Sequence, residues 1–262
     1  SPGRRLNTRT LNMDVSTGAV ELMNGQGGCI YLAPGDLMRY GYPPMSTLEL
    51  LEGSELTLCS AGNGGGVSAY TPSVVNVLDS SINNCHALHR YGGALDLQES
   101  AAEELASTTM NALNVVRSQI VNCSSYAYGG AAFTLSSFTL SHLHFDSSLV
   151  AGCTAHRGGA LWAESATFTM SDTQFIGCHA VDRESANGRR RLAHTNTALC
   201  PTDFPSPCAD GGAMMLKSVP SFVPKRLTMS DCTASNQGGG IFASQPTTML
   251  DLEGLTASRC TA

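Results

Sequence analysis

The sequence predicts an all-β protein folded as a parallel β-helix, a solenoid of about seven to eight coils with loop insertions. Three observations lead to this prediction. A glycine pair recurs seven times along the 262 residues, a cysteine stands at one fixed place in each repeat, and small residues alternate with polar residues around that cysteine. One structural unit is therefore repeated along most of the chain.

The glycine pairs mark the repeat. A small or apolar residue follows each pair, and successive pairs are 38, 27, 37, 29, 53 and 28 residues apart. We expect a corner at each pair, where the backbone bends sharply or Cβ atoms would collide. The predicted corner glycines are Gly28, Gly66, Gly93, Gly130, Gly159, Gly212 and Gly240.

A cysteine column follows the same period. Ala or Ser stands two places after each cysteine, and Ser, Thr or His stands between them. This is the period of two that a strand with one buried face requires. Short strands that pair with the same strand of the next coil, about 4.8 Å away, fit the repeat. The column consists of Cys59, Cys85, Cys123, Cys153, Cys178, Cys232 and Cys260.

The cysteines leave two interpretations open. The column is either a stack of small buried side chains or contains disulfides between neighbouring coils, whose spacing lies within the Cα separation of a disulfide. The closely spaced pairs typical of a structural zinc site are absent. Cys200 and Cys208, in a long insertion, are predicted to form a disulfide in an oxidising compartment.

The glycine corner, together with the apolar-x-x-polar strand before it, resembles the repeats of chlamydial polymorphic outer membrane proteins. More broadly it resembles the pectin-lyase-like right-handed β-helix, over about residues 20 to 262. The Phe-x-x-Asn motif of that family is replaced here by Ile82-Asn83-Asn84-Cys85 or Phe175-Ile176-Gly177-Cys178. The Cys-rich form therefore looks more like a secreted eukaryotic relative. The resemblance implies right-handed coils and, as a class of function, surface adhesion.

We expect one elongated domain from a longer polypeptide. Residues 1–26 are expected to end a preceding coil, and residues 27–262 to form the β-helix, with an insertion at 182–210. Insertions in solenoids gather on one face, often the binding face. The predicted contact surfaces are Leu32–Thr47, Glu99–Asn111 and Asp182–Asp210.

Two local motifs suggest modification or processing. The run Arg189–Arg191 is interpreted as part of a solvated loop, with protease processing or contact with an anionic ligand as the alternatives. Asn122 begins the sequon Asn122-Cys123-Ser124 and is a candidate glycosylation acceptor.

A catalytic site is not predicted. Glycoside hydrolysis needs two carboxylates roughly 5–9.5 Å apart. Asp79 and Asp146 are expected two coils apart, about 10 Å along the axis. Together with Asp172 they are interpreted as scattered surface charge. Trp162 is expected to pack in the core or at an edge, with sugar stacking as the alternative.

No metal site or cofactor is predicted either. His86 and His179 share an outward column but are expected three coils apart, roughly 14 Å. His142 and His144 could face the same side of one strand, but two ligands make a weak site. The net charge of −6 excludes a general nucleic-acid footprint, and no run of 18 apolar residues is present to span a membrane.

We therefore expect a non-catalytic, extracellular structural or adhesive segment of a large cell-surface or filament protein. Its expected partners are other protein subunits of that assembly, with glycans as further candidates. The alternative is a carbohydrate-active enzyme or carbohydrate-binding module on the pectin-lyase-like fold. That alternative predicts acidic residues clustered on one face of neighbouring coils.

Overall fold

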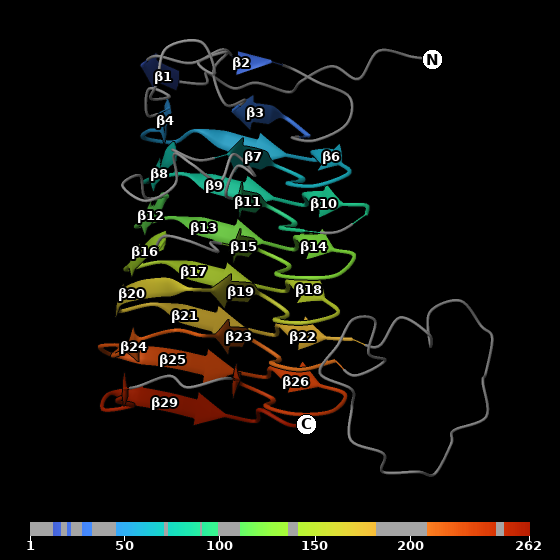
Figure 1. Cartoon of the computed structure of the whole chain (residues 1–262), viewed down its shortest axis with the longest axis vertical. Coiled ribbons are helices and arrows are strands. Elements are labelled where there is room, and N and C mark those ends of the chain that lie inside the picture. Colours follow the sequence, from blue (N-terminus) through green and yellow to red (C-terminus); the bar gives the residue numbers. More distant parts are fainter. Residues whose placement is uncertain are drawn as a thin grey trace, which may run out of the picture.

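The computed structural model describes residues 13–16, 20–21, 28–32, 46–70, 73–89, 91–98, 111–135, 141–181, 209–244 and 249–262. These residues form 29 short strands and no helix. The strands form four sheets that run along the long axis of the molecule. Within each sheet the strands are stacked along that axis, with the N-terminal strands at the top of Figure 1 and the C-terminal strands at the bottom.

We name the four sheets A to D. Sheet A contains β1 (Met13–Ser16), β4 (Ser46–Leu50), β8 (Ser73–Leu78), β12 (Ala112–Val116), β16 (Ser141–Asp146), β20 (Ala166–Ser171), β24 (Ser221–Phe222) and β28 (Met249–Leu250). Sheet B contains β2 (Val20–Glu21), β3 (Ile30–Leu32), β7 (Val67–Tyr70), β11 (Leu95–Gln98), β15 (Ala132–Leu135), β19 (Leu161–Glu164), β23 (Met214–Lys217) and β27 (Ile241–Ser244).

The strands of the other two sheets are shorter. Sheet C contains β5 (Glu55–Thr57), β9 (Ser81–Asn83), β13 (Gln119–Val121), β17 (Leu149–Ala151), β21 (Gln174–Ile176), β25 (Leu227–Ser230) and β29 (Leu255–Ser258). Sheet D contains β6 (Ser60–Ala61), β10 (His86–Ala87), β14 (Ser124–Ser125), β18 (Thr154–Ala155), β22 (His179–Ala180) and β26 (Thr233–Ala234).

Each coil passes through the sheets in the order A, C, D and B. Six coils are complete in the described residues, namely β4–β7, β8–β11, β12–β15, β16–β19, β20–β23 and β24–β27. Equivalent strands of successive coils pair in parallel; Ile120, for example, lies between Ile82 and Val150. The prediction of an all-β parallel β-helix is confirmed.

The two N-terminal strands run in the opposite direction. β1 pairs antiparallel with β4, and β2 pairs antiparallel with β3. They therefore cover the first strand edges of sheets A and B, as the top of Figure 1 shows. That residues 1–26 end a preceding coil stays a prediction, although these two strands do not follow the direction of the coils.

Inward side chains fill one continuous core. Buried residues alternate with partly exposed ones along β8, β12 and β16, as the period-two pattern requires. Phe145 and Phe175, from neighbouring coils, pack with their ring centroids 6.5 Å apart. Full burial of a side chain of this size stabilises the fold by about 1.5–3 kcal/mol, so contacts between coils hold the solenoid together.

A column of tight corners separates sheets C and D. The residue before each column cysteine has a left-handed backbone, with φ between 52° and 62°. Gly, Asn and Asp adopt this conformation at least cost, and five of the seven positions carry one of them. The column is Leu58, Asn84, Asn122, Gly152, Gly177, Asp231 and Arg259. The exposed Asn122 therefore stands at a corner between two strands.

The glycine corner lies one residue earlier than predicted in the two units that contain three consecutive glycines. A Cβ atom at Gly28 would lie 2.0 Å from Gly65 O, and one at Gly65 would lie 2.2 Å from Gly93 O. Gly66 instead matches Ala94, since their backbones are hydrogen-bonded in register. The corner column is therefore Gly28, Gly65, Gly93, Gly130, Gly159, Gly212 and Gly239, which corrects Gly66 and Gly240.

Close approach of neighbouring coils explains this choice. The backbone of each corner glycine lies against a carbonyl group of the next coil, so only hydrogen fits in place of a side chain. Residues 33–45, 99–110 and 182–208 lie outside the described residues. The three predicted contact surfaces also lie outside the described residues, apart from the ends of each surface. Cys200, Cys208 and the run Arg189–Arg191 lie outside them as well.

Candidate functional site

The outer face of sheet B carries a buried column that lies outside the main core. Leu95 and Leu97 of β11 belong to the core, so Asp96 between them lies on the opposite face of the strand. The strand register continues this outer column through every coil from β7 to β23. Its members, none more than 6% exposed, are Ser68, Asp96, Phe133, Trp162 and Met215.

Aromatic rings form the middle of this column. Phe133 stacks on Trp162 at 4.8 Å between ring centroids and on Tyr91 at 4.3 Å. The ring centroid of Tyr128 lies 5.1 Å from that of Trp162. Burial raises the pKa of Tyr128 to about 12. Tyr91 and Tyr128 precede the glycine corners and pair with each other as an isolated bridge, which brings their rings over the outer face of sheet B. Trp162 is thus packed, as expected, but in an aromatic cluster that sequence reasoning missed.

A sequence signal for the buried outer face does exist. The apolar runs Ala131-Ala132-Phe133 and Ala160-Leu161-Trp162-Ala163 begin one residue before strands β15 and β19 and continue into them. Consecutive apolar residues in a strand are typical of burial on both faces. The period-two pattern beside the cysteines belongs to sheets C and D, where one face is solvated.

Asp96 is the buried acid at one end of the aromatic cluster. Ser68 Oγ donates a hydrogen bond to Asp96 Oδ2 over 3.1 Å, and Gln98 Nε2 donates to the same oxygen over 2.7 Å. Burial raises the pKa of Asp96 to about 7, against the smaller lowering effect of these two hydrogen bonds. The carboxyl group therefore changes its charge near neutral pH.

The surroundings hold the three side chains in place. Ser68 comes from β7 and faces Asp96 of β11 in the parallel register. Asn111 Nδ2 donates to Gln98 O over 3.3 Å and so fixes the end of β11. The other carboxyl oxygen, Asp96 Oδ1, has no hydrogen-bond partner in the described part of the chain. A carboxyl group that titrates near pH 7 and contacts a hydroxyl and a carboxamide is suited to moving a proton between them.

The seven predicted column cysteines lie in register along the core. The first six each stand next to a paired residue of sheet D, from Ser60 through His86 to Thr233. Cys260 stands next to Thr261, which pairs with Thr233 as an isolated bridge. Cys153 Sγ donates to Ala151 O at 3.4 Å and to Ile120 O of the preceding coil at 3.8 Å. Burial raises the pKa of the Cys153 thiol, which keeps it protonated and unreactive.

A single disulfide is present among the described cysteines. It joins Cys59 to Cys29, which lies outside the column. The remaining column members, Cys85, Cys123, Cys153, Cys178, Cys232 and Cys260, are free thiols. The column cysteines are therefore stacked and are not bonded to one another. The disulfide between coils joins one column cysteine to a cysteine outside the column.

The histidines do not form a metal site in the described residues. His86 bonds Ser124 at 2.9 Å and His179 bonds Thr233 at 2.8 Å, each within the outward column of sheet D. His142 and His144 both lie on the outer face of β16, as their burial pattern shows. The described chain contains no group of three or more His, Cys, Asp or Glu side chains placed to hold a metal ion.

Surface carboxylates are paired with arginines of the next coil. Arg117 donates to both oxygens of Asp79, at 2.7 and 2.6 Å, and lowers the pKa of that carboxyl group. Asp172 with Arg226 and Asp231 with Arg259 repeat the arrangement. These three ion pairs each join neighbouring coils along the axis.

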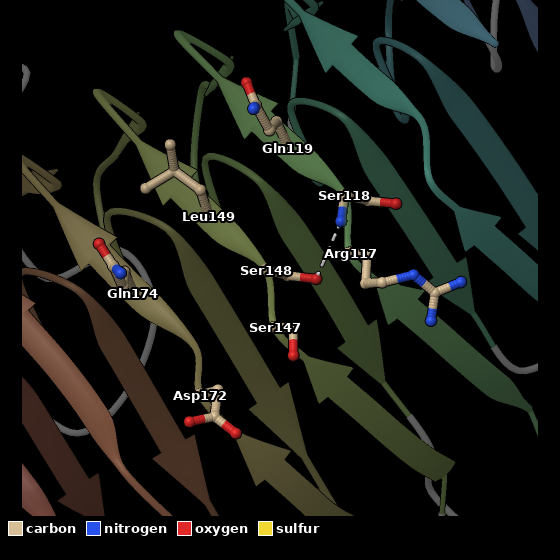
Figure 2. Close-up of a pocket in the computed structure, with 8 residues that line it drawn as sticks. All are labelled: Arg117, Ser118, Gln119, Ser147, Ser148, Leu149, Asp172 and Gln174. Atoms are coloured by element: carbon tan, nitrogen blue, oxygen red, sulfur yellow. Dashed lines mark hydrogen bonds between the residues drawn. The ribbon is translucent and has the colours of Figure 1, made fainter. Parts of the chain in front are cut away.

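A polar notch of about 210 Å³ lies where the row of arginine–carboxylate pairs is interrupted. Figure 2 shows Ser147 between Arg117 and Asp172, where neighbouring coils would otherwise bring opposite charges together. Gln119, Leu149 and Gln174 extend from three consecutive strands of sheet C on its other side. The notch combines one apolar side chain with carboxamide and charged groups.

Comparison with family models, curated proteins and solved structures found no match to this chain. Within the described ranges, no helix is long and apolar enough to cross a membrane.

Proposed function

We propose that the chain is a non-catalytic, extracellular structural or adhesive segment of a large cell-surface or filament protein. The observation that carries this proposal is the axial pairing of polar side chains on the outer surface. Asn76 donates to Glu49, Asn114 donates to Asn76, and the corner arginines bind carboxylates one coil away. These contacts join neighbouring coils along the axis, and an elongated stack of coils suits a spacer or a display scaffold.

An oxidising location is supported by the cysteines. A disulfide between Cys29 and Cys59 persists most readily outside the cytosol. Asn122 is exposed at a corner and stands in a glycosylation sequon, so a secreted chain would present it to the glycosylation machinery. Because of the glycine corners, our preferred family assignment remains the resemblance to chlamydial polymorphic outer membrane protein repeats and to the pectin-lyase-like fold.

The proposed partners are other protein subunits, contacted through the insertion at 182–210. A test replaces residues 183–207 with a short Gly-Ser linker and measures binding to the native surface or filament preparation from which the protein is isolated. We expect weaker binding with unchanged circular dichroism, because the coils fold through their own contacts. Unchanged binding by a folded variant would contradict this assignment.

A carbohydrate-binding module is the second candidate, and the notch in Figure 2 favours it. In this notch Leu149 is available to the apolar face of a sugar ring, and the amides of Gln119 and Gln174 are available to its hydroxyl groups. A glycan array probed with the folded chain and with Q119A/Q174A tests this candidate. Binding that the double variant loses would support it, and absence of binding to any glycan would remove it.

A further inference from the structure

We propose that Ser68 and Gln98 become joined by an internal ester bond, with Asp96 transferring the proton. The inference rests on one juxtaposition. A single carboxyl oxygen, Asp96 Oδ2, contacts both the Ser68 hydroxyl, at 3.1 Å, and the Gln98 carboxamide nitrogen, at 2.7 Å. The acid thus touches the proton that must leave the nucleophile and the nitrogen that must receive it.

The reaction needs no further reagent. Ser68 Oγ attacks Gln98 Cδ while Asp96 Oδ2 accepts the hydroxyl proton, in the manner of a general base. Collapse of the tetrahedral intermediate breaks the Cδ–Nε2 bond, and Asp96 returns the proton to the departing nitrogen. The products are a Ser68 Oγ–Gln98 Cδ ester and one molecule of ammonia, and Asp96 ends in the state in which it began.

The surroundings limit hydrolysis of the ester. Ser68 and Asp96 are 0% exposed and Gln98 is partly exposed, so water has little access to the bond from the Ser68 side. The parallel register fixes Ser68 opposite Asp96, and Gln98 lies two residues further on the same face of β11. The pKa of Asp96, raised to about 7 by burial, leaves the group able both to accept and to donate a proton at neutral pH.

The same chain contains a natural comparison without the acid. Ser73 Oγ donates to Asn111 Oδ1 at 3.1 Å, so a hydroxyl again meets a carboxamide between two coils. Among the described residues, the hydrogen bonds of this pair include no carboxylate group. We therefore expect Ser73 and Asn111 to remain unmodified, which separates an acid-dependent reaction from a general property of buried serine–amide pairs.

The bond would tie β7 to β11, two neighbouring strands of sheet B. Between these two coils, force along the axis would then be carried by a covalent bond as well as by backbone hydrogen bonds. The inference goes beyond the proposed structural role and does not depend on secretion or on any partner, since every reacting group belongs to this chain.

Mass spectrometry of the full chain tests the proposal. The protein is produced in bacteria, then reduced and alkylated, and its intact mass is compared with that calculated for the fully alkylated sequence. We expect a loss of about 17 Da, the mass of ammonia, and a cross-linked peptide that contains Ser68 and Gln98. Alkaline hydrolysis of that peptide should release glutamate at position 98.

Variants locate the reaction. S68A and D96N should each restore the full sequence mass, with folding checked by circular dichroism. S141A serves as the matched control, because Ser141 is a buried serine whose hydroxyl has no hydrogen-bond partner in the described chain. Its mass loss should equal that of the parent. A folded parent chain with the full mass and an intact Gln98 amide would overturn the proposal, as would a mass loss that persists in both S68A and D96N.

Discussion

Cys29 is disulfide-bonded to Cys59 of the following coil, with their Cα atoms 5.5 Å apart. Cys29 occupies the position after the corner glycine, which Gly66 and Ala94 fill in the next two coils. Its side chain therefore approaches the cysteine column from a different wall of the coil. Cysteines stacked within the column point in one direction, so their sulfur atoms are poorly oriented for bonding each other.

Loss of this disulfide should destabilise the N-terminal coils. The bond closes a loop with a sequence separation of 30 residues, for which the chain-entropy model gives about 3.5 kcal/mol. We expect C29A to lower the free energy of unfolding by up to that amount. Urea unfolding in the presence and absence of a reducing agent measures it. The parent should respond to the reducing agent and C29A should not.

The same geometry recurs at the other end of the described chain. A Cβ atom placed on Gly240 would lie 3.8 Å from both Cβ and Sγ of Cys260, which is a suitable Cβ separation for a disulfide. We expect G240C to form a bond with Cys260 on mild oxidation and to stabilise the fold by about 3 kcal/mol. Thiol counting and unfolding of G240C, with G240C/C260S as the control, test this. A thiol count that oxidation leaves unchanged would contradict the equivalence of positions 29 and 240.

Asp96 should make the stability depend on pH in an unusual direction. Its pKa rises from 3.8 to about 7 on folding because the carboxyl group is buried, so ionisation opposes folding. The free energy of unfolding should therefore be highest near pH 4, fall as pH rises from about 4 to 7, and then level off. The fall is on the order of 4 kcal/mol.

The variant D96N isolates this contribution. Asparagine does not ionise, so its stability should be nearly flat over the same interval. Asp79, Asp172 and Asp231 affect the stability only at pH values below this interval. Arginine lowers their pKa values, so their contribution disappears only in stronger acid. Urea unfolding at several pH values compares the two proteins. A parent profile as flat as that of D96N would exclude a raised pKa at Asp96.

Two glycines should differ sharply in their tolerance of a methyl group. A Cβ atom at Gly159 would lie 2.1 Å from Gly212 O, whereas one at Gly177 would meet nothing within 4 Å. G177A should cost only about 1 kcal/mol for a left-handed alanine. G159A forces two backbones apart and should cost several times more. Thermal unfolding of both variants compares them directly, and equal costs would argue against close packing at the glycine corner.

The fold was predictable because its determinants repeat. Seven cysteines with the same neighbours reveal a strand and its period without any knowledge of long-range contacts. The repeat does not determine the corner in the two triple-glycine segments. Gly64-Gly65-Gly66 contains two possible pairs, and only the contact of Gly65 with the next coil determines which pair forms the corner.

The candidate site was harder to predict because it depends on pairing across coils. Ser68 and Asp96 are 28 residues apart in the sequence, and neither belongs to a recognisable motif. Asp96 also lies on the outer face of a solenoid, where an acidic residue is expected to be solvated. No local sequence pattern predicts its burial, which the structure alone reveals.

Trp162 reports on that outer face, because it is the only tryptophan in the chain. It is 6% exposed and stacked on Phe133, so its fluorescence should be blue-shifted and protected from acrylamide in the folded protein. W162A should lower the free energy of unfolding by about 3–5 kcal/mol, as expected when a large buried aromatic side chain is removed. Y126A is the matched control, since Tyr126 is 50% exposed and should cost much less. Fluorescence quenched as readily as that of free tryptophan, with W162A and Y126A equally stable, would mean that the outer face of sheet B is open to solvent and available to a ligand.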